Sequence, residues 1–247
     1  TPTHLHAEPA VAGMARGLPV LGEKPIAHTI EEAHRLLYGC VPNIETDVDP
    51  TSKLLIGYSL RFHPGLRRVK QLLDEGAIGT VRHASIHFGS YLPDWRPGFD
   101  YRKGYAASKE QGGGILLDAS HELDYARWLF GEPASVMAQV QNTGALEIET
   151  EDVADLLVRF ENGIQANIHL DYLSRTPERR CSIVGDRATA NWGFDTDFVW
   201  LRNCPAQANP VTPDDLYRAE LRHFLACIRG EETPLVTGED GIQVLRL

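Results

Sequence analysis

The 247-residue sequence lacks the features that mark membrane-spanning, secreted and nucleic-acid-binding proteins. No stretch approaches the roughly 20 consecutive apolar residues of a membrane helix, and no basic segment followed by an apolar one opens the chain. The formal net charge of −10 gives no attraction to phosphate backbones or anionic membrane surfaces. These absences argue against nucleic acid and membrane partners and favour a small-molecule ligand.

Cysteine is scarce, and its spacing gives no sign of a disulfide framework or a metal centre. The four cysteines, Cys40, Cys181, Cys204 and Cys227, are widely separated and form no Cys-x-x-Cys motif. We therefore expect reduced thiols, a cytoplasmic protein and no metal site.

The first part of the chain alternates short apolar runs with amphipathic segments. Residues 18–21 and 54–62 are apolar and bounded by turn residues, which is typical of buried strands. Residues 30–37 and 63–79 carry apolar side chains at helical spacing, whereas residues 38–53 show no period and are expected to form a loop. The order strand, helix, strand, helix predicts a parallel sheet covered by helices.

After Gly79 the pattern changes to a period of two, which is typical of strands with one polar face. Residues 81–88 alternate in this way, and two hairpins are expected around the turns at 161–163 and 185–186. Helices are expected over 115–130 and 213–230, so the second part is α+β with an open mixed or antiparallel sheet. In the last of these helices five apolar residues are expected to face inward: Leu216, Leu221, Phe224, Leu225 and Ile228.

Four blocks of the sequence carry a resemblance to a known family. In chain order they are TPTHLHAEPAVAGMARGLPVLGEKPIAHTIEEAHRL, GYSLRFHP, GAIGTV and GGGILLDASHELDYARWLFG. In content and order they resemble the glucose-fructose oxidoreductase, inositol dehydrogenase and rhizopine-catabolism (Gfo/Idh/MocA) family of NAD(P)-dependent oxidoreductases. Glu-Lys-Pro alone is a weak signal, but together with the upstream Thr-Pro-x-x-x-His and the downstream glycines and histidine it is specific.

The patterns and the resemblance together predict an α/β chain with two domains. Residues 1–66 are expected to form the C-terminal half of a dinucleotide-binding domain, with a partial doubly wound (Rossmann-like) parallel sheet. Residues 67–247 are expected to form an α+β domain for substrate binding and oligomerisation, with an open, largely antiparallel sheet. The resemblance implies a homodimer or homotetramer, because sheets of this family commonly pair face to face between subunits.

The phosphate-binding turn Gly-x-Gly-x-x-Gly occurs nowhere in the sequence. In the family this turn and the acid that selects the adenine ribose lie upstream of the position that Thr1 occupies here. The expected cofactor is therefore NAD or NADP, with no residue in the sequence to choose between them.

The resemblance implies hydride transfer between a nicotinamide cofactor and a secondary alcohol of a sugar, inositol or related polyol. Lys24, at the end of a strand, is expected to polarise or deprotonate the hydroxyl, with His121 as general acid or base and Asp118 orienting or tuning the pair. The spacing of three between Asp118 and His121 puts them on one helical face. Most family members have a spacing of four, so the role of Asp118 is less secure than that of His121.

Further site residues come from the same blocks and from the long loop 89–114, whose aromatic and charged side chains suit sugar binding. Asp124 is expected to lie in an outer shell or on the helix surface. Arg61 and His63 follow a strand, where one can line the site or cap the next helix. The expected cofactor-binding residues are Thr1, Pro2, His6, Glu23, Lys24, Pro25, Trp95 and Arg96, and the expected substrate-binding residues are Arg61, Tyr91, Tyr101 and Tyr105.

Two other functions remain open at this point. One is a catalytically silent regulator that keeps the fold and binds a sugar or nucleotide, although such a protein has no chemical need for both Lys24 and His121. The other is a redox-neutral glycosidase or dehydratase that uses bound NAD transiently. Net accumulation of NADH would separate the dehydrogenase from the redox-neutral enzyme.

Overall fold

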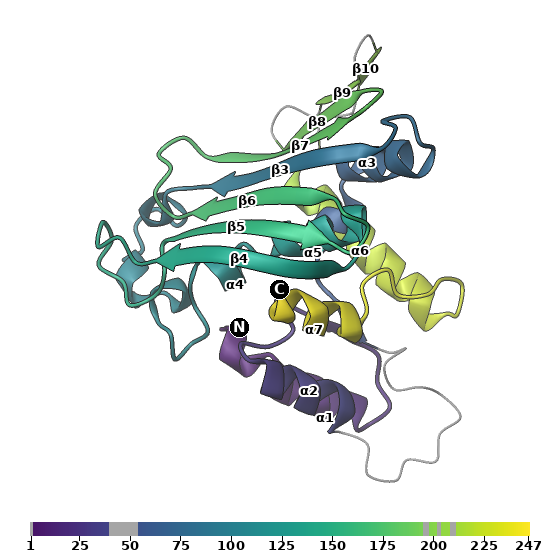
Figure 1. The fold of residues 1–247 in the computed structure, drawn as a ribbon. Helices are drawn as coiled ribbons and strands as arrows, with labels where there is room; N and C mark the ends of the chain where they lie inside the picture. The colour runs from purple at the N-terminus through teal and green to yellow at the C-terminus, as the bar shows by residue number, and fades with distance from the viewer. Residues whose placement is uncertain (1, 40–53, 195–197, 202–203, 208–210) are drawn as a thin grey trace.

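Two sheets of unequal size organise the chain (Figure 1). The computed structural model describes residues 2–39, 54–194, 198–201, 204–207 and 211–247. The loop expected over 38–53 therefore lies, from residue 40 onward, outside the described residues. The smaller sheet consists of β1 (Val20–Gly22) and β2 (Leu54–Ile56), which pair in parallel as expected.

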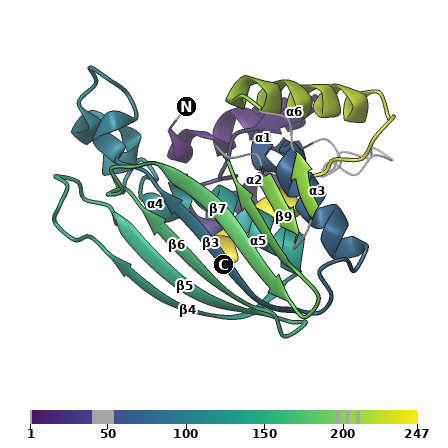
Figure 2. The same cartoon turned by 90° about the horizontal axis from the view of Figure 1, so that it is seen from above.

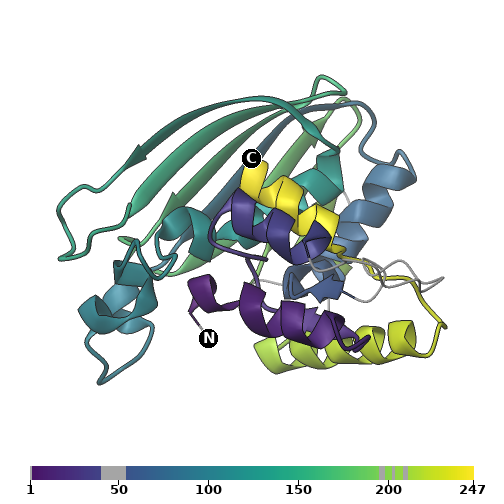
Figure 3. The same cartoon turned by 90° about the horizontal axis from the view of Figure 1, so that it is seen from below.

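Helices pack against the small sheet and against one another to complete the first part of the chain. Thr29 ends an extended segment and its hydroxyl accepts a hydrogen bond from the Glu32 amide at 3.2 Å, which caps the helix that follows. The last helix of the chain returns to this region and packs beside that helix (Figures 1 and 3). These helices are α1 (Ala7–Met14), α2 (Ile30–Tyr38) and the C-terminal α7 (Gly238–Arg246).

The larger sheet is mixed, with the order β10-β9-β8-β7-β3-β6-β5-β4. β3 and β6 pair in parallel, and the other neighbours pair antiparallel. This confirms the expected open, largely antiparallel sheet and both hairpins. The strands are β3 (Val81–Gly89), β4 (Pro133–Gln141), β5 (Val153–Phe160), β6 (Gln165–Asp171), β7 (Glu178–Gly185), β8 (Thr189–Gly193), β9 (Phe198–Leu201) and β10 (Cys204–Gln207).

One face of the large sheet packs on helices, and the other has no helix over it among the described residues (Figure 2). Alternation along β5 buries Leu156 and Val158 on the covered face and exposes Asp155 and Leu157 on the other. The covering helices are α3 (Pro64–Asp74), which contacts β8, α4 (Ile115–Asp118) and α5 (Ser120–Phe130). The covered face therefore supplies the core, and the site described below lies at its edge.

Two elements differ from the sequence expectation. The strand expected over 54–62 ends at Ile56, and Ser59–Phe62 form a 3-10 helix, because a fully buried apolar run does not distinguish a strand from a tight helix. The helix expected over 115–130 is interrupted at Ala119, whose φ of −93° and ψ of 24° are not helical. Asp118 and His121 thus belong to two helices, and the helical-face argument that placed them together is wrong.

The inward face expected for the late helix α6 (Pro213–Ile228) is wrong at three of its five residues. Leu216 is buried, but the side chains of Leu221, Leu225 and Ile228 are between 43% and 49% exposed. The helix instead buries Leu216, Glu220 and Ala226, and His223 beside this stripe accepts from the Leu235 amide at 2.9 Å. The inner face of α6 therefore contains the buried Glu220, whereas Leu221 faces solvent.

Candidate active site

Sequence blocks far apart in the chain meet at the carboxyl end of β1. The His6 Nδ1 atom lies 2.8 Å from the Pro25 carbonyl oxygen, which joins the first block to the Glu-Lys-Pro segment. The His4 amide donates to the Gln111 carbonyl at 3.4 Å, which joins the same block to the glycine turn. Carboxyl ends of parallel strands are where dinucleotide-binding sheets hold their ligands.

The three consecutive glycines allow this close approach. A Cβ atom on Gly113 would lie 2.2 Å from the Tyr105 carbonyl oxygen, a distance that no side chain tolerates. Gly114 has a φ of +112°, and a Cβ atom there would lie 2.2 Å from the Glu151 carboxylate. The loop carrying Tyr105 can therefore press against the start of α4.

Lys24 is held at the centre of the meeting point. Its Nζ donates to the backbone carbonyl of Asp118 at 2.5 Å, and its peptide bond to Pro25 is cis. Burial lowers the pKa of Lys24, while the Asp118 charge opposes that shift and the Arg179 charge adds to it. A larger fraction of this amine is therefore neutral than for an exposed lysine.

The Asp118 carboxylate has partners other than those expected. Oδ1 accepts from the Tyr105 hydroxyl at 2.6 Å, and Oδ2 accepts from the Tyr172 hydroxyl at 2.5 Å. No hydrogen bond within the described part of the chain joins it to His121. The backbone carbonyl of Asp118 thus binds Lys24, and its carboxylate binds Tyr105 of the long loop.

His121 lies on the first turn of α5, with its ring packed edge-on against Tyr58 at a centroid distance of 5.6 Å. Its Nδ1 atom is buried, and the described residues provide it with no hydrogen-bond partner. Burial lowers the pKa of His121 well below its usual value, and the positive charges of Lys24 and Arg179 add to the shift. The ring is therefore neutral at physiological pH, and Nδ1 is free to bond a ligand.

The long loop lines a hollow with four of the expected residues. Trp95, Arg96, Tyr101 and Tyr105 border a free volume of about 30 Å³, which is enough to hold a water molecule. The Trp95 indole donates to the Ser90 hydroxyl at 2.9 Å and packs against the Tyr172 ring at 5.4 Å. The loop is thus tied to the residues that hold Asp118, and its binding role stays a prediction.

The remaining expected residues have no hydrogen bond to Lys24 or His121 within the described part of the chain. Pro2 precedes a 3-10 turn, Glu23 is exposed at the strand end, and Thr1 lies outside the described residues. The Tyr91 ring lies under the Arg175 guanidinium at 3.5 Å. His63 caps α3, because its Nδ1 accepts from the Gly65 amide at 3.0 Å.

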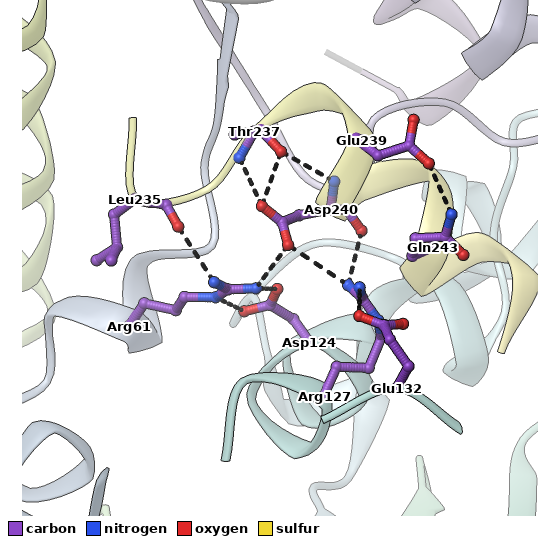
Figure 4. A network of polar contacts seen from close by, with 9 residues as sticks. All are labelled: Arg61, Asp124, Arg127, Glu132, Leu235, Thr237, Glu239, Asp240 and Gln243. Carbon is purple, nitrogen blue, oxygen red and sulfur yellow. Dashed lines mark hydrogen bonds and ion pairs between the residues drawn. The ribbon is translucent and has the colours of Figure 1, made fainter. Parts of the chain in front are cut away.

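Arg61 belongs to a buried ion-pair network rather than to the pocket (Figure 4). Its guanidinium donates to both carboxylate oxygens of Asp124 at 2.9 and 2.7 Å and to the Leu235 carbonyl. Asp240 on α7 lies 3.6 Å from Arg61 and 3.7 Å from Arg127. Asp124 is fully buried, which excludes the helix surface of the two expected places and leaves the outer shell as a prediction.

The sequence reasoning missed four polar residues near the site. Glu122 is fully buried and accepts from Arg179 Nε at 2.8 Å, Tyr172 binds Asp118, and Glu220 is buried on α6. A signal existed for Arg179, because it has the same strand parity as the inward-facing Cys181 and Ile183. Glu122 also interrupts an otherwise apolar helix face.

No cluster of three or more histidine, cysteine, aspartate or glutamate side chains with metal-binding geometry occurs in the described ranges. Within the same ranges no helix is both long and apolar enough to cross a membrane.

The chain is similar to sugar-modifying oxidoreductases. The 1,5-anhydro-D-fructose reductase of Ensifer adhaerens is 29% identical over 252 residues, which cover 98% of this chain and 72% of the reductase. An aldose-aldose oxidoreductase from Caulobacter crescentus, solved with glycerol, has a TM-score of 0.83 at 27% identity and covers 100% of this chain and 72% of its own. The WlbA dehydrogenase of Bordetella pertussis, solved with NADH and UDP-GlcNAcA, has a TM-score of 0.78 at 25% identity, over 99% of this chain and 72% of its own.

A family model provides the remaining comparison. The model described as the GFO/IDH/MocA C-terminal domain matches residues 66–191, which span the large sheet up to β8 and the helices α3, α4 and α5. Together with the relatives above, this match extends the resemblance seen in the four sequence blocks. The chain belongs to the Gfo/Idh/MocA family of NAD(P)-dependent oxidoreductases.

Proposed function

We propose that this chain carries the substrate-binding and proton-transferring part of a dehydrogenase that oxidises a secondary alcohol of a sugar, inositol or related polyol. The observation that carries the proposal is the position of the Lys24 amine. It lies 2.5 Å from the Asp118 carbonyl at the carboxyl end of β1, close enough to His121 to depress the pKa of that imidazole. An amine and an imidazole at such an edge suit the removal of a proton from an alcohol.

The residues present fit the nicotinamide end of a dinucleotide. Lys24 and the unpartnered Nδ1 of His121 provide polar groups there, and Trp95 provides an aromatic wall that is 37% exposed. When bound, the cofactor supplies the hydride acceptor or donor. His6 and Pro25 support this edge through the contact of the His6 ring with the Pro25 carbonyl. The NADH in the Bordetella relative supports the same cofactor class.

In this mechanism Lys24 exchanges the proton of the reacting hydroxyl. The Asp118 carbonyl fixes the amine, and the lowered pKa of Lys24 makes it a stronger candidate base at neutral pH than an exposed lysine. The neutral His121 ring binds the same hydroxyl or takes the proton onward. Asp118 positions Lys24, and its carboxylate is fixed by the hydroxyls of Tyr105 and Tyr172.

Substitution of the two proposed catalytic side chains tests this assignment. Lys24→Met and His121→Asn should each reduce kcat by about 10²-fold or more, because each removes a proton-transfer group. Lys70 on α3, which pairs with Asp74, provides the matched control. Lys70→Met should retain the kcat of the parent protein. Activity is followed as NADH formation with sugars and polyols, and saturable NADH binding is followed by fluorescence on the same proteins.

Near-wild-type rates in both variants would contradict the assignment. Saturable NADH binding without turnover of any polyol would favour the silent regulator, and product formation without net NADH would favour the redox-neutral enzyme.

The uncovered face of the large sheet supports a homodimer. Met137 and Leu157 are register partners on adjacent strands, and their side chains are 73% and 45% exposed. A second copy related by a two-fold axis would cover both. Leu157→Glu should lower the apparent mass in sedimentation, whereas Leu18→Glu, at an exposed site elsewhere, should not. An unchanged mass for Leu157→Glu would contradict this interface.

The free thiols Cys181 and Cys227 fit a reducing, cytoplasmic location.

A further inference from the structure

A partly buried ion pair joins β7 to the helix that carries His121. Arg179 on β7 donates from Nε to Oε1 of Glu122 on α5 at 2.8 Å. The Glu122 side chain is fully buried, and its Oε2 atom has no hydrogen-bond partner among the described residues. Glu122 follows His121 directly in the chain, so the pair is anchored to the same helical turn as the catalytic ring.

The Arg179 guanidinium is fixed in place by aromatic rings as well as by Glu122. It lies over the Phe88 ring at 4.4 Å and 5.9 Å from the Phe194 ring centroid. Phe88 is its register partner on β3, so strand pairing sets this contact. Such cation–π contacts restrain the side chain in addition to the ion pair.

Several groups of the site respond to the Arg179 charge. It contributes to the lowered pKa of Lys24, His121 and His63. Glu122 acts in the opposite direction on Lys24, and both are weaker there than burial and Asp118. Burial raises the pKa of Glu122 itself, and the Arg179 charge opposes that shift.

We propose that Arg179, anchored by Glu122, is a positioning residue that sets the electrostatic field at Lys24 and His121. This inference rests on the proposed function, because it assigns a role within the same site. The fixed guanidinium favours the uncharged forms of the amine and the imidazole, which are the forms that accept a proton. Glu122 holds the guanidinium and partly offsets its charge at Lys24.

The two members of the pair therefore predict opposite effects. Glu122→Gln leaves the Arg179 charge unopposed, so the acidic limb of the kcat/KM profile should move to lower pH. Arg179→Gln removes the charge, so the limb should move to higher pH. Each shift should be about one pH unit or less, because both charges act on Lys24 more weakly than burial and the Asp118 charge do. Arg179→Lys keeps the charge and should retain the parent profile more closely than Arg179→Gln.

A measurement without turnover separates this inference from the proposed function. The chain has five lysines, so ¹³C-labelled lysine gives a simple NMR spectrum in which Lys24→Met assigns the Lys24 Cε signal. The titration midpoint of that signal should fall in Glu122→Gln and rise in Arg179→Gln. Absent turnover with these NMR shifts present would contradict the proposed function and leave the field assignment standing.

The matched control is the exposed pair Arg82–Asp186, 3.4 Å apart on β3 and the β7–β8 turn. Arg82→Gln and Asp186→Asn should leave the Lys24 titration unchanged. Arg179→Gln leaves the buried Glu122 carboxylate without its partner and can prevent folding, which thermal unfolding will show. In that case Glu122→Gln and Arg179→Lys provide the test. An unshifted Lys24 midpoint in folded Glu122→Gln, or shifts of the same sign in both charge-removing variants, would overturn the proposal.

Discussion

At the scale of single residues, the Asp118 carboxylate has the clearest structural role. The hydroxyls of Tyr105 and Tyr172 each donate to a different oxygen, and the carbonyl of the same residue receives Lys24. Burial and the Asp118 charge raise the pKa of Tyr172, so its hydroxyl remains a donor at physiological pH. One aspartate therefore connects the lysine, the pocket loop and the end of β6.

The bond from the Tyr172 hydroxyl to Asp118 should contribute to stability. Tyr172→Phe leaves a buried carboxylate oxygen without its donor, which should reduce the free energy of unfolding by about 1–3 kcal/mol. Chemical denaturation measures the loss. Tyr101→Phe is the control, because its hydroxyl accepts only a 3.5 Å contact from the Glu147 amide, and it should show no measurable change. Equal stabilities of Tyr172→Phe and the parent protein would show that this bond contributes nothing.

At the scale of elements, helix α6 brings an acid to the end of the small sheet. Glu220 Oε1 and Glu23 Oε2 lie 3.8 and 3.7 Å from the point where Gly57 would carry a Cβ atom. Oε1 has no hydrogen-bond partner among the described residues. Burial, and then repulsion by Glu23, raise the pKa of Glu220 to about 7.

This pKa predicts a pH dependence of stability. The folded chain binds the Glu220 proton more tightly than the unfolded chain, whose pKa is near 4.5, so the unfolding free energy should fall as pH rises from 4.5 to about 7. Glu220→Gln should remove the share of that decline that Glu220 causes and raise stability at pH 8 by about 3 kcal/mol at most. Urea denaturation at pH 5 and pH 8 measures both effects.

Glu31 is an exposed glutamate on α2 and provides the control. Glu31→Gln should leave the pH dependence of stability unchanged. A Glu220→Gln protein that keeps the full pH dependence of the parent would contradict the assignment to this side chain.

At the scale of the whole molecule, the network in Figure 4 joins distant parts of the chain. Arg61 comes from the segment after β2, Asp124 and Arg127 from α5, and Asp240 from α7. The Arg61 and Asp124 side chains are only 5% and 1% exposed. The same charges therefore couple the small sheet, the site helix and the C-terminal helix.

Breaking this network should destabilise all three parts together. Asp124→Asn leaves the buried Arg61 charge without its main partner, which should cost about 3–5 kcal/mol. Hydrogen exchange should show α5 and α7 losing protection in parallel. Glu231→Gln, which breaks the exposed pair with Arg229, should leave stability unchanged. Loss of protection confined to α7 would contradict the coupling.

Much of the fold could be predicted, because it depends on local periodicity. Period-2 alternation predicted β3, β5, β6 and β7, and the turns at Gly163 and Gly185 predicted their hairpins. Boundaries within buried runs could not be predicted, because uniform hydrophobicity carries no period there, as residues 59–62 show. The α6 face was mispredicted because the area available for packing depends on the partner elements and not on the helix.

The sequence by itself determined the alternation of elements, the family blocks and the candidate pair Lys24 and His121. Only the tertiary structure decided which side chains meet. Arg61 binds Asp124 across 63 positions, Arg179 binds Glu122 across 57, and Asp118 turns to Tyr172 across 54. Charged and hydroxyl side chains select partners by distance and desolvation in the folded chain, and neither quantity is present in a local pattern.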